Sequence, residues 1–180
     1  MAWRAGPSRS PVRVVEDTGR LVTLIDAERA AADLVIVDLE GSASRAVGHA
    51  IARSDLVIIP AGASAMDIGQ AGRAIELVRE EEEVLGRAIA ARLLFTRTSP
   101  QIPTKAEKAI VEELRTAGVP MLRERLHQRQ AFGAMFSYRL TLDELDEREV
   151  NGLPAAVTNA VALVDEITAV LNTIHARKAA

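Results

Sequence analysis

The sequence repeats one pattern, in which a short, continuously apolar run rich in β-branched residues is followed by a longer stretch of helical composition. The clearest runs are Leu34–Leu39 and Leu56–Pro60, and a third strand is predicted at Arg92–Thr96. Runs without polar–apolar alternation are typical of strands buried on both faces of a parallel sheet. Weaker strands are predicted at Val12–Val15 and Val119–Leu122. The alternation predicts an α/β fold, with a mostly parallel β-sheet flanked by helices.

Helical stretches separate the predicted strands. Ser64 and Thr104 each begin one, and an acid follows each of them three residues later, which is the capping-box pattern of a helix start. Gly118 stands where a left-handed helix stop belongs. Further helices are predicted at residues 21–32, 43–53 and 127–137 and after Pro154, and one more capped turn at 141–144.

The chain is predicted to consist of one linker and one domain. Residues 1–11 are rich in Pro, Gly, Ser and Arg, which predicts a loop or linker. Residues 12–176 form a single α/β domain in this interpretation. Neither a signal peptide nor a spanning helix is predicted, because the opening lacks an apolar core and the longest apolar runs fall short of the ~20 residues that a membrane span needs. We therefore expect a cytoplasmic protein.

The amino-acid composition excludes several classes of function. The chain has no Cys, which excludes a disulfide scaffold, a thiolate metal site and a cysteine nucleophile. Its three His, at positions 49, 127 and 175, are far apart and match no zinc-binding spacing. The formal net charge of −3 argues against strong general binding to polyanions but leaves a local basic face open.

Ligands of parallel α/β proteins bind at the carboxyl ends of the strands, so the candidate site lies in the loops that follow them. Asp38 ends a predicted buried strand, and Gly41 follows three residues later. A carboxylate in this position suits the hydration shell of Mg²⁺, and a glycine N–H can approach a phosphate closely. The alternative is an acid that merely caps the next helix.

The other strand-end loops leave similar alternatives open. Residues 60–67 form a small-residue loop before a helix N-terminus, which could receive an anion or be a simple turn. Arg97 could stack on a base or bind a phosphate, or be an ordinary loop arginine. The arginines between 123 and 129, together with Arg139, could form a phosphate rim, a patch for the DNA backbone or a solvated helix start.

Five segments, taken in order, carry a resemblance to a known family. They are residues 33–44 (DLVIVDLEGSAS), 52–60 (ARSDLVIIP), Asp67 with the helix behind it, 94–100 (LFTRTSP) and 129–136 (RQAFGAMF). Over about residues 12–170 the chain resembles the ParA/MinD group of deviant-Walker P-loop ATPases. It is most similar to the ParA-type plasmid and chromosome partitioning proteins of alphaproteobacteria. The resemblance implies a P-loop NTPase-like fold that is shortened at its N-terminus.

The resemblance also implies roles for individual residues. Asp38 corresponds to the switch acid that holds Mg²⁺ through water, and Gly41 faces the γ-phosphate. Thr96 and Arg97 match a strand-end motif near the adenine, and Arg129 lies in the segment on the far side of the nucleotide. The implied cofactor is Mg·ATP. The implied partners are a ParB-like protein, non-specific DNA and a second copy or full-length relatives, at the plasmid or nucleoid and not at a membrane.

The sequence departs from this family at the phosphate-binding loop. That loop needs a Gly-Lys pair, and the three Lys of this chain follow Thr, Glu and Arg. We therefore expect Mg·ATP binding to be weak or absent and ATP hydrolysis to be lost, so the assignment as an enzyme stays open. A sheet that lacks the family's first strand exposes unpaired edges, which predicts marginal stability or association.

Three other functions remain as alternatives. The first is a nucleotide-free interaction module that binds full-length ParA-type proteins or a partner protein. The second is a phosphoacceptor receiver domain with Asp38 as the acceptor, but its acidic pair near the first strand and its strand-end Lys are not visible in the sequence. The third is a relative in the same superfamily that binds border-enhancer DNA in T-DNA transfer. The residues present do not distinguish this relative from a partitioning protein.

Overall fold

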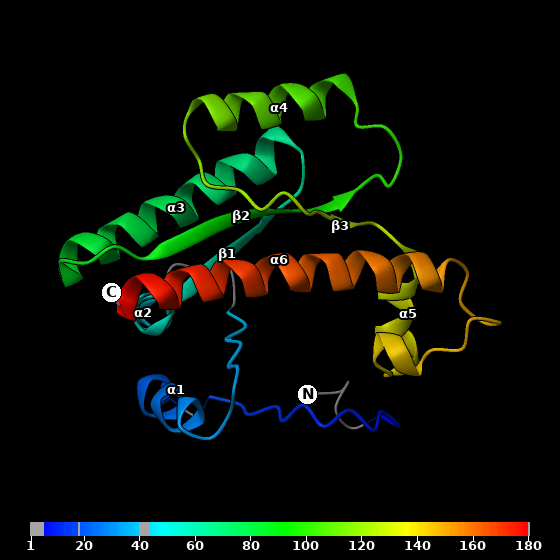
Figure 1. The fold of residues 1–180 in the computed structure, drawn as a ribbon, viewed down its shortest axis with the longest axis horizontal. Coiled ribbons are helices and arrows are strands. Elements are labelled where there is room, and N and C mark those ends of the chain that lie inside the picture. The colour runs from blue at the N-terminus through cyan, green and yellow to red at the C-terminus, as the bar shows by residue number, and fades with distance from the viewer. Residues whose placement is uncertain (1–5, 18, 40–43, 180) are drawn as a thin grey trace.

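The computed structural model of the chain describes residues 6–17, 19–39 and 44–179 (Figure 1). In chain order the elements are α1 (Leu21–Arg29), α2 (Arg45–Arg53), β1 (Leu56–Ala61), α3 (Ala65–Leu85), β2 (Ala90–Thr98), α4 (Lys105–Thr116), β3 (Leu126–His127), α5 (Gln130–Tyr138), the 3₁₀ helix η1 (Leu142–Glu144) and α6 (Leu153–Ala179).

The sheet described has three parallel strands in the order β1-β2-β3. β1 pairs with β2 from Leu56 opposite Ala90 to Ala61 opposite Phe95. α3 and α4 cover one face of the sheet, and α6 crosses the other face (Figure 1). The α/β class predicted from the sequence, a parallel sheet flanked by helices, is confirmed.

The core lies on both faces of β2. Leu93 and Phe95, which are 1% and 2% exposed, pack against α3 and α4. Leu94 points to the opposite face, because side chains alternate along a strand, and it packs against Leu163 of α6. Burial on both faces explains why the middle of this strand, residues 93–95, is continuously apolar in sequence.

The buried strand predicted at Leu34–Leu39 is wrong for this structure. The segment connects α1 to α2 without joining the described sheet, and Leu34 and Ile36 are 61% and 82% exposed. The weaker strand predicted at Val12–Val15 is not formed either. A strand needs a neighbour for its backbone groups, and neither segment has one among the described residues. Apolar composition indicated a preference for a strand but not the presence of a partner.

The strand predicted at Val119–Leu122 is reduced to a single bridge. Leu93 donates its N–H to the carbonyl of Pro120 and accepts the N–H of Leu122, both at 2.9 Å. Pro120 has no N–H of its own, which limits the ladder at this point. The third strand, β3, lies a few residues further along the chain and pairs with the end of β2.

The predicted helix boundaries follow local side-chain chemistry. The Ser64 hydroxyl accepts the N–H of Asp67, and the Thr104 hydroxyl accepts the N–H of Glu107, both at 3.1 Å. Gly118, with φ of +70°, lies just after α4, where a left-handed residue stops a helix. These three boundaries are confirmed.

α6 is 27 residues long and, by length and apolar composition alone, could cross a membrane. A long core helix of a folded domain passes the same test. Leu163 is 8% exposed and packs on the sheet, whereas Val157, Val161 and Val164 are 36%, 52% and 59% exposed. α6 therefore covers the sheet with one side and leaves an apolar stripe on another.

Glu144 of η1 holds the N-terminal stretch against the rest of the fold. Its carboxylate accepts hydrogen bonds from the Ser8 hydroxyl at 2.6 Å, the Arg9 N–H at 2.5 Å and the Thr141 N–H at 2.8 Å. It also completes the capping box of η1, so the capped turn predicted at 141–144 is confirmed. The hydrogen bond from Ser8, followed by those from Thr141 and Arg9, lowers the pKa of Glu144 to about 2.

We expect this contact to open only in strong acid. A carboxylate with a lowered pKa stabilises the fold above its unfolded pKa, and the stabilisation is lost as the pH falls through the folded value, here from 4.5 to about 2. The NMR shift of the Arg9 amide should therefore titrate with a midpoint of about 2. Glu144→Gln should abolish this titration, and Glu147→Gln, which changes an exposed acid nearby, should not. A midpoint at the ordinary glutamate value would contradict the contact.

Candidate functional site

The carboxyl ends of β1 and β2 lie side by side and carry the first group of predicted site residues. Thr96 and Arg97 are near the end of β2, and Arg97 has a left-handed backbone with φ of +57°. Its guanidinium lies 3.2 Å from the carboxylate of Asp67 in α3, whose other oxygen accepts the Ser64 hydroxyl at 2.7 Å. The Arg97 conformation is strained for a residue with a side chain, and it coincides with this ion pair.

Gly62 completes this turn by leaving room for the ion pair. A Cβ at position 62 would lie 2.4 Å from the Asp67 carboxylate and 3.2 Å from the Arg97 guanidinium. The N-terminal turn of α3 therefore already holds an anion, the side chain of Asp67, in the place where a helix dipole favours one. Of the two interpretations of this loop, the described contacts favour the turn.

A second polar group lies beside the first, around the end of β2 and β3. The Arg125 guanidinium binds the carboxylate of Glu107 in α4 at 2.5 Å, and the two side chains are 24% and 8% exposed. The guanidinium carbon of Arg125 also lies 5.4 Å from the centre of the Phe95 ring. Arg125 therefore joins α4 to the sheet through a half-buried ion pair and a cation–π contact.

Asn159 of α6 holds the short strand β3 in place. Its side-chain oxygen accepts the N–H of His127 at 2.9 Å, and its amide donates to the carbonyl of Arg125 at 2.7 Å. The imidazole of His127 in turn lies 2.9 Å from the Thr98 hydroxyl. A single side chain, 8% exposed, thus provides the partners that a longer strand ladder would provide.

Glu166, also on α6, binds the loop that precedes β3. Its two oxygens accept the N–H groups of Arg123 and Glu124 at 2.9 and 2.7 Å, and the Arg123 guanidinium lies 3.5 Å away. Burial raises the pKa of Glu166, but the backbone hydrogen bonds and the Arg123 charge outweigh it and hold the pKa below its ordinary value. Arg123 and Arg125, considered as contacts for phosphate, thus each have a carboxylate partner.

The remaining predicted residues are not all brought to this edge. Arg129 precedes α5, shortly after β3, and its buried Nε has no hydrogen-bond partner among the described residues. Asp38 lies exposed on the connection between α1 and α2, outside the sheet. Gly41 lies outside the described residues. In the described ranges no group of three or more His, Asp or Glu could hold a metal ion. The nucleotide roles of Asp38, Gly41, Thr96, Arg97 and Arg129 remain predictions.

The sequence did not identify three residues of this edge, Glu107, Asn159 and Glu166, as parts of a site. Glu107 was interpreted only as the acid of a capping box, and neither Asn159 nor Glu166 was singled out. A lone Asn in an apolar helix is a signal that could have been used, because a buried amide needs polar partners. Glu166 has no such sequence signal.

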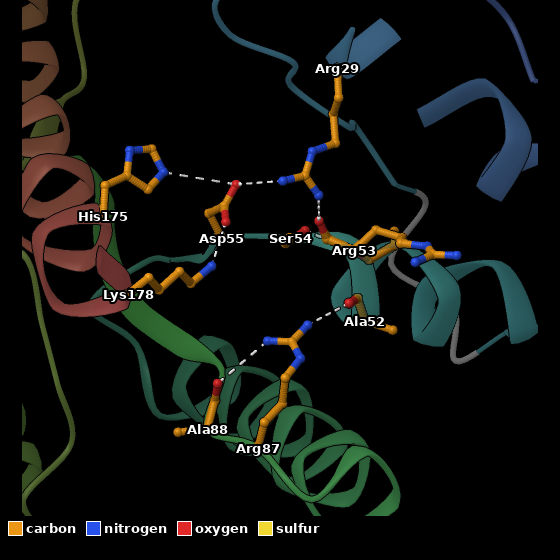
Figure 2. A network of polar contacts seen from close by, with 10 residues as sticks. Arg29, Ala52, Arg53, Ser54, Asp55, Arg87, Ala88, His175 and Lys178 are labelled. Carbon is orange, nitrogen blue, oxygen red and sulfur yellow. Dashed lines mark hydrogen bonds and ion pairs between the residues drawn. The ribbon is translucent and has the colours of Figure 1, made fainter. Parts of the chain in front are cut away.

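At the opposite, amino end of β1, Asp55 joins several elements (Figure 2). Its carboxylate binds the Lys178 ammonium at 2.6 Å and the Arg29 guanidinium at 3.5 Å, and the His175 ring nitrogen is 4.0 Å away. Burial raises the pKa of Asp55, but the hydrogen bond and charge of Lys178, with smaller contributions from Arg29 and His175, outweigh it and lower the pKa. Asp55 therefore ties α1 and the end of α6 to the sheet.

A parallel sheet with helices on both faces and with polar loops at its carboxyl edge defines an open-sheet α/β protein. The solved structure of apo McdA from Cyanthece has a similar fold, with a TM-score of 0.60 over 78% of this chain and 57% of that chain, at 15% sequence identity. Residues 18–177 match the family described as VirC1 protein, and the chain belongs to this family.

A curated relative supports the same assignment. "Protein ParA" of Rhizobium radiobacter is 38% identical over 129 residues, which are 72% of this chain and 58% of the relative. The resemblance to ParA-type proteins predicted from the sequence is therefore confirmed. The chain spans less than two thirds of the length of both relatives, at 58% and 57%.

Proposed function

We propose that this chain is a ParA-like partitioning protein that acts in plasmid or chromosome segregation, and that its 180 residues do not hydrolyse ATP by themselves. The family match and the 38% identity to Protein ParA support the first part. Support for the second part comes from the three Lys, none of which follows a Gly as a phosphate-binding loop requires. The proposal includes a cytoplasmic location at the plasmid or nucleoid, with a ParB-like protein, DNA or longer relatives as partners.

The contacts at the carboxyl edge of the sheet support this proposal most directly. A nucleoside triphosphate needs donors that are free to bind its phosphates. The guanidinium groups of Arg97 and Arg125 are bound to Asp67 and Glu107, at 3.2 and 2.5 Å. Mg·ATP would have to displace these carboxylates, so the residues described do not fit the nucleotide as they stand.

A nucleotide-free binding role is favoured by a separate observation. Val157, Val161 and Val164 form an exposed apolar stripe along α6, and a contiguous apolar patch is typical of surfaces that bind other proteins. We infer that the chain works as an interaction module within the partitioning system.

The proposal predicts that Mg·ATP leaves the thermal stability of the chain unchanged. A ligand at about one hundred times its Kd would add about 2.7 kcal/mol, which raises the melting temperature of a chain of this length by about 5–10 °C. We expect no measurable rise with millimolar Mg·ATP and no phosphate release. Asp38→Asn, at the exposed position assigned to the switch acid, should behave like the unchanged chain.

A rise in the melting temperature with Mg·ATP would instead support a nucleotide-binding site. A rise with Mg·ATP that Asp38→Asn removes would show that the nucleotide binds and that Asp38 contributes to the site. A rise that survives Asp38→Asn would show nucleotide binding without this acid. Either rise overturns the nucleotide-free role.

A further inference from the structure

Helices α3 and α4, which cover the same face of the sheet, border an apolar groove (Figure 1). A Cβ at Gly69 would meet no atom within 4 Å, so the groove is open on the side of α3. Its volume is about 310 Å³, and it is lined by the first turns of α3 and the last turns of α4, with Ala65, Ile68, Gly69, Ile110, Glu113 and Leu114. The groove therefore has room for a large aliphatic side chain.

A large aliphatic side chain is exposed at the other end of α4. Ile102 lies in the loop between β2 and α4, and it is 83% exposed. The 12 residues of α4 separate it from the last turn of that helix, over a length of about 18 Å. Ile102 is therefore too far away to fill the groove of its own chain.

The charges of α4 are divided between its two ends. Lys105 and Lys108 lie in the first turn, and Glu112 and Glu113 lie toward the end of the helix. Glu112 pairs with Arg115 in the same helix, but within the described residues Lys105, Lys108 and Glu113 form no ion pair. Lys105 and Glu113 are about 12 Å apart along the helix, so they cannot pair with each other. This division favours an antiparallel contact between two copies of α4.

The exposed side of α4 allows a second helix to approach closely. Lys105, Ala109 and Glu113 follow one another at four-residue spacing, so they lie in one row along the helix. All three are exposed, and Ala106, which is also exposed, lies beside the row. The middle of the row is therefore small and apolar, whereas its two ends carry opposite charges. The acidic end belongs to the wall of the groove.

We propose that the groove between α3 and α4 binds Ile102 of a second copy of this chain, in a twofold pair with antiparallel α4 helices. A twofold axis at Ala109 places Lys105 of each copy opposite Glu113 of the other and brings Ile102 to the last turn of the other α4, beside the groove. Each copy supplies one aliphatic side chain and one groove, so the pair closes on itself. Burial of Ile102 provides the attraction, and the two ion pairs fix the direction of the helices.

The inference goes beyond the proposed function, because it uses a different surface from the α6 stripe and requires neither nucleotide nor DNA. The first test is sedimentation equilibrium of the unmodified chain, without either, over a range of concentrations. We expect a monomer–dimer equilibrium in which Ile102→Glu raises the dimer Kd by about tenfold or more, because a carboxylate would enter an apolar groove beside Glu113. Val84→Glu is the matched control, since Val84 is 79% exposed and lies at the far end of α3. It should leave the dimer Kd unchanged.

Charge reversal tests the antiparallel pairing itself. Lys105→Glu and Glu113→Lys should each weaken the dimer, because two like-charged pairs then replace two opposite ones. An equimolar mixture of the two variants should regain a Kd close to the original, since both pairs of the mixed dimer carry opposite charges. Both substitutions suit the helix dipole, with an acid in the first turn and a base in the last, so α4 should stay folded.

Three outcomes would overturn the inference. They are a chain that stays monomeric at every concentration, equal weakening by Ile102→Glu and Val84→Glu, and a mixture that associates no more tightly than the separate charge variants. Thermal stabilisation by Mg·ATP would instead overturn the proposed function and leave a dimer through α4 standing.

Discussion

Replacing Arg125 by methionine is expected to lower the free energy of unfolding by about 3–5 kcal/mol. Glu107 is 7% exposed, and without Arg125 its carboxylate would remain largely buried with no opposite charge beside it. Methionine keeps an apolar chain to cover the Phe95 ring, so the main loss is that of the charge. Urea unfolding followed by circular dichroism gives the free energy directly.

An exposed pair on the same helix provides the control. Arg115 lies 3.0 Å from Glu112 on α4, and the two side chains are 68% and 65% exposed. Arg115→Met should therefore cost at most about 1 kcal/mol, because solvent screens exposed pairs. The double variant Glu107→Gln with Arg125→Met should recover much of the loss, since it removes the unpaired charge. Equal losses for Arg115→Met and Arg125→Met would show that burial does not strengthen the inner pair.

The position of Arg125 shows which contacts local sequence patterns can predict and which they cannot. The caps at Ser64 and Thr104 were predicted correctly, because donor and acceptor lie three residues apart and need only the helix between them. The Glu107–Arg125 pair joins residues 18 positions apart across an intervening loop. No spacing in the sequence indicates that such residues meet, so the arginine was assigned to solvent, phosphate or DNA.

The apolar runs show a second limit of the sequence. Leu34–Leu39 and the core of β2 have similar composition, yet Ile36 is 82% exposed and Leu93 is 1% exposed. β2 is flanked by β1 on one side and by β3 and the Met121 bridge on the other. Composition indicates that a segment favours a strand, but whether a neighbouring strand is present to pair with it depends on the whole sheet.

For the candidate site, the sequence predicted where the loops lie but not what their side chains bind. Thr96 and Arg97 do lie at the carboxyl end of a parallel strand, as the α/β rule requires. The rule does not predict that Arg97 and Arg125 bind carboxylates of the same chain. Whether an arginine is free for a ligand depends on those tertiary contacts, which the loop sequence does not contain.

Replacing Asn159 by leucine is expected to cause the second large loss in the free energy of unfolding. Leucine has a similar size and favours a helix, so α6 should persist. The N–H of His127 and the carbonyl of Arg125 would lose their partners, at a cost of about 1–3 kcal/mol for each buried group left unpaired. The free energy of unfolding should fall accordingly in a urea titration, and the His127 amide should exchange with solvent much faster.

Asn172 provides the matched control, because it is an exposed asparagine on the same helix. Asn172→Leu should leave both the unfolding free energy and the His127 amide unchanged. If Asn159→Leu also left that amide protected, the bridge at the end of β2 would hold β3 without Asn159. If instead the amide opens, α6 is what keeps a strand of only two residues in register. The segment leading to Arg129 and α5 then depends on a helix that lies far along the chain, which no inspection of the strand itself would reveal.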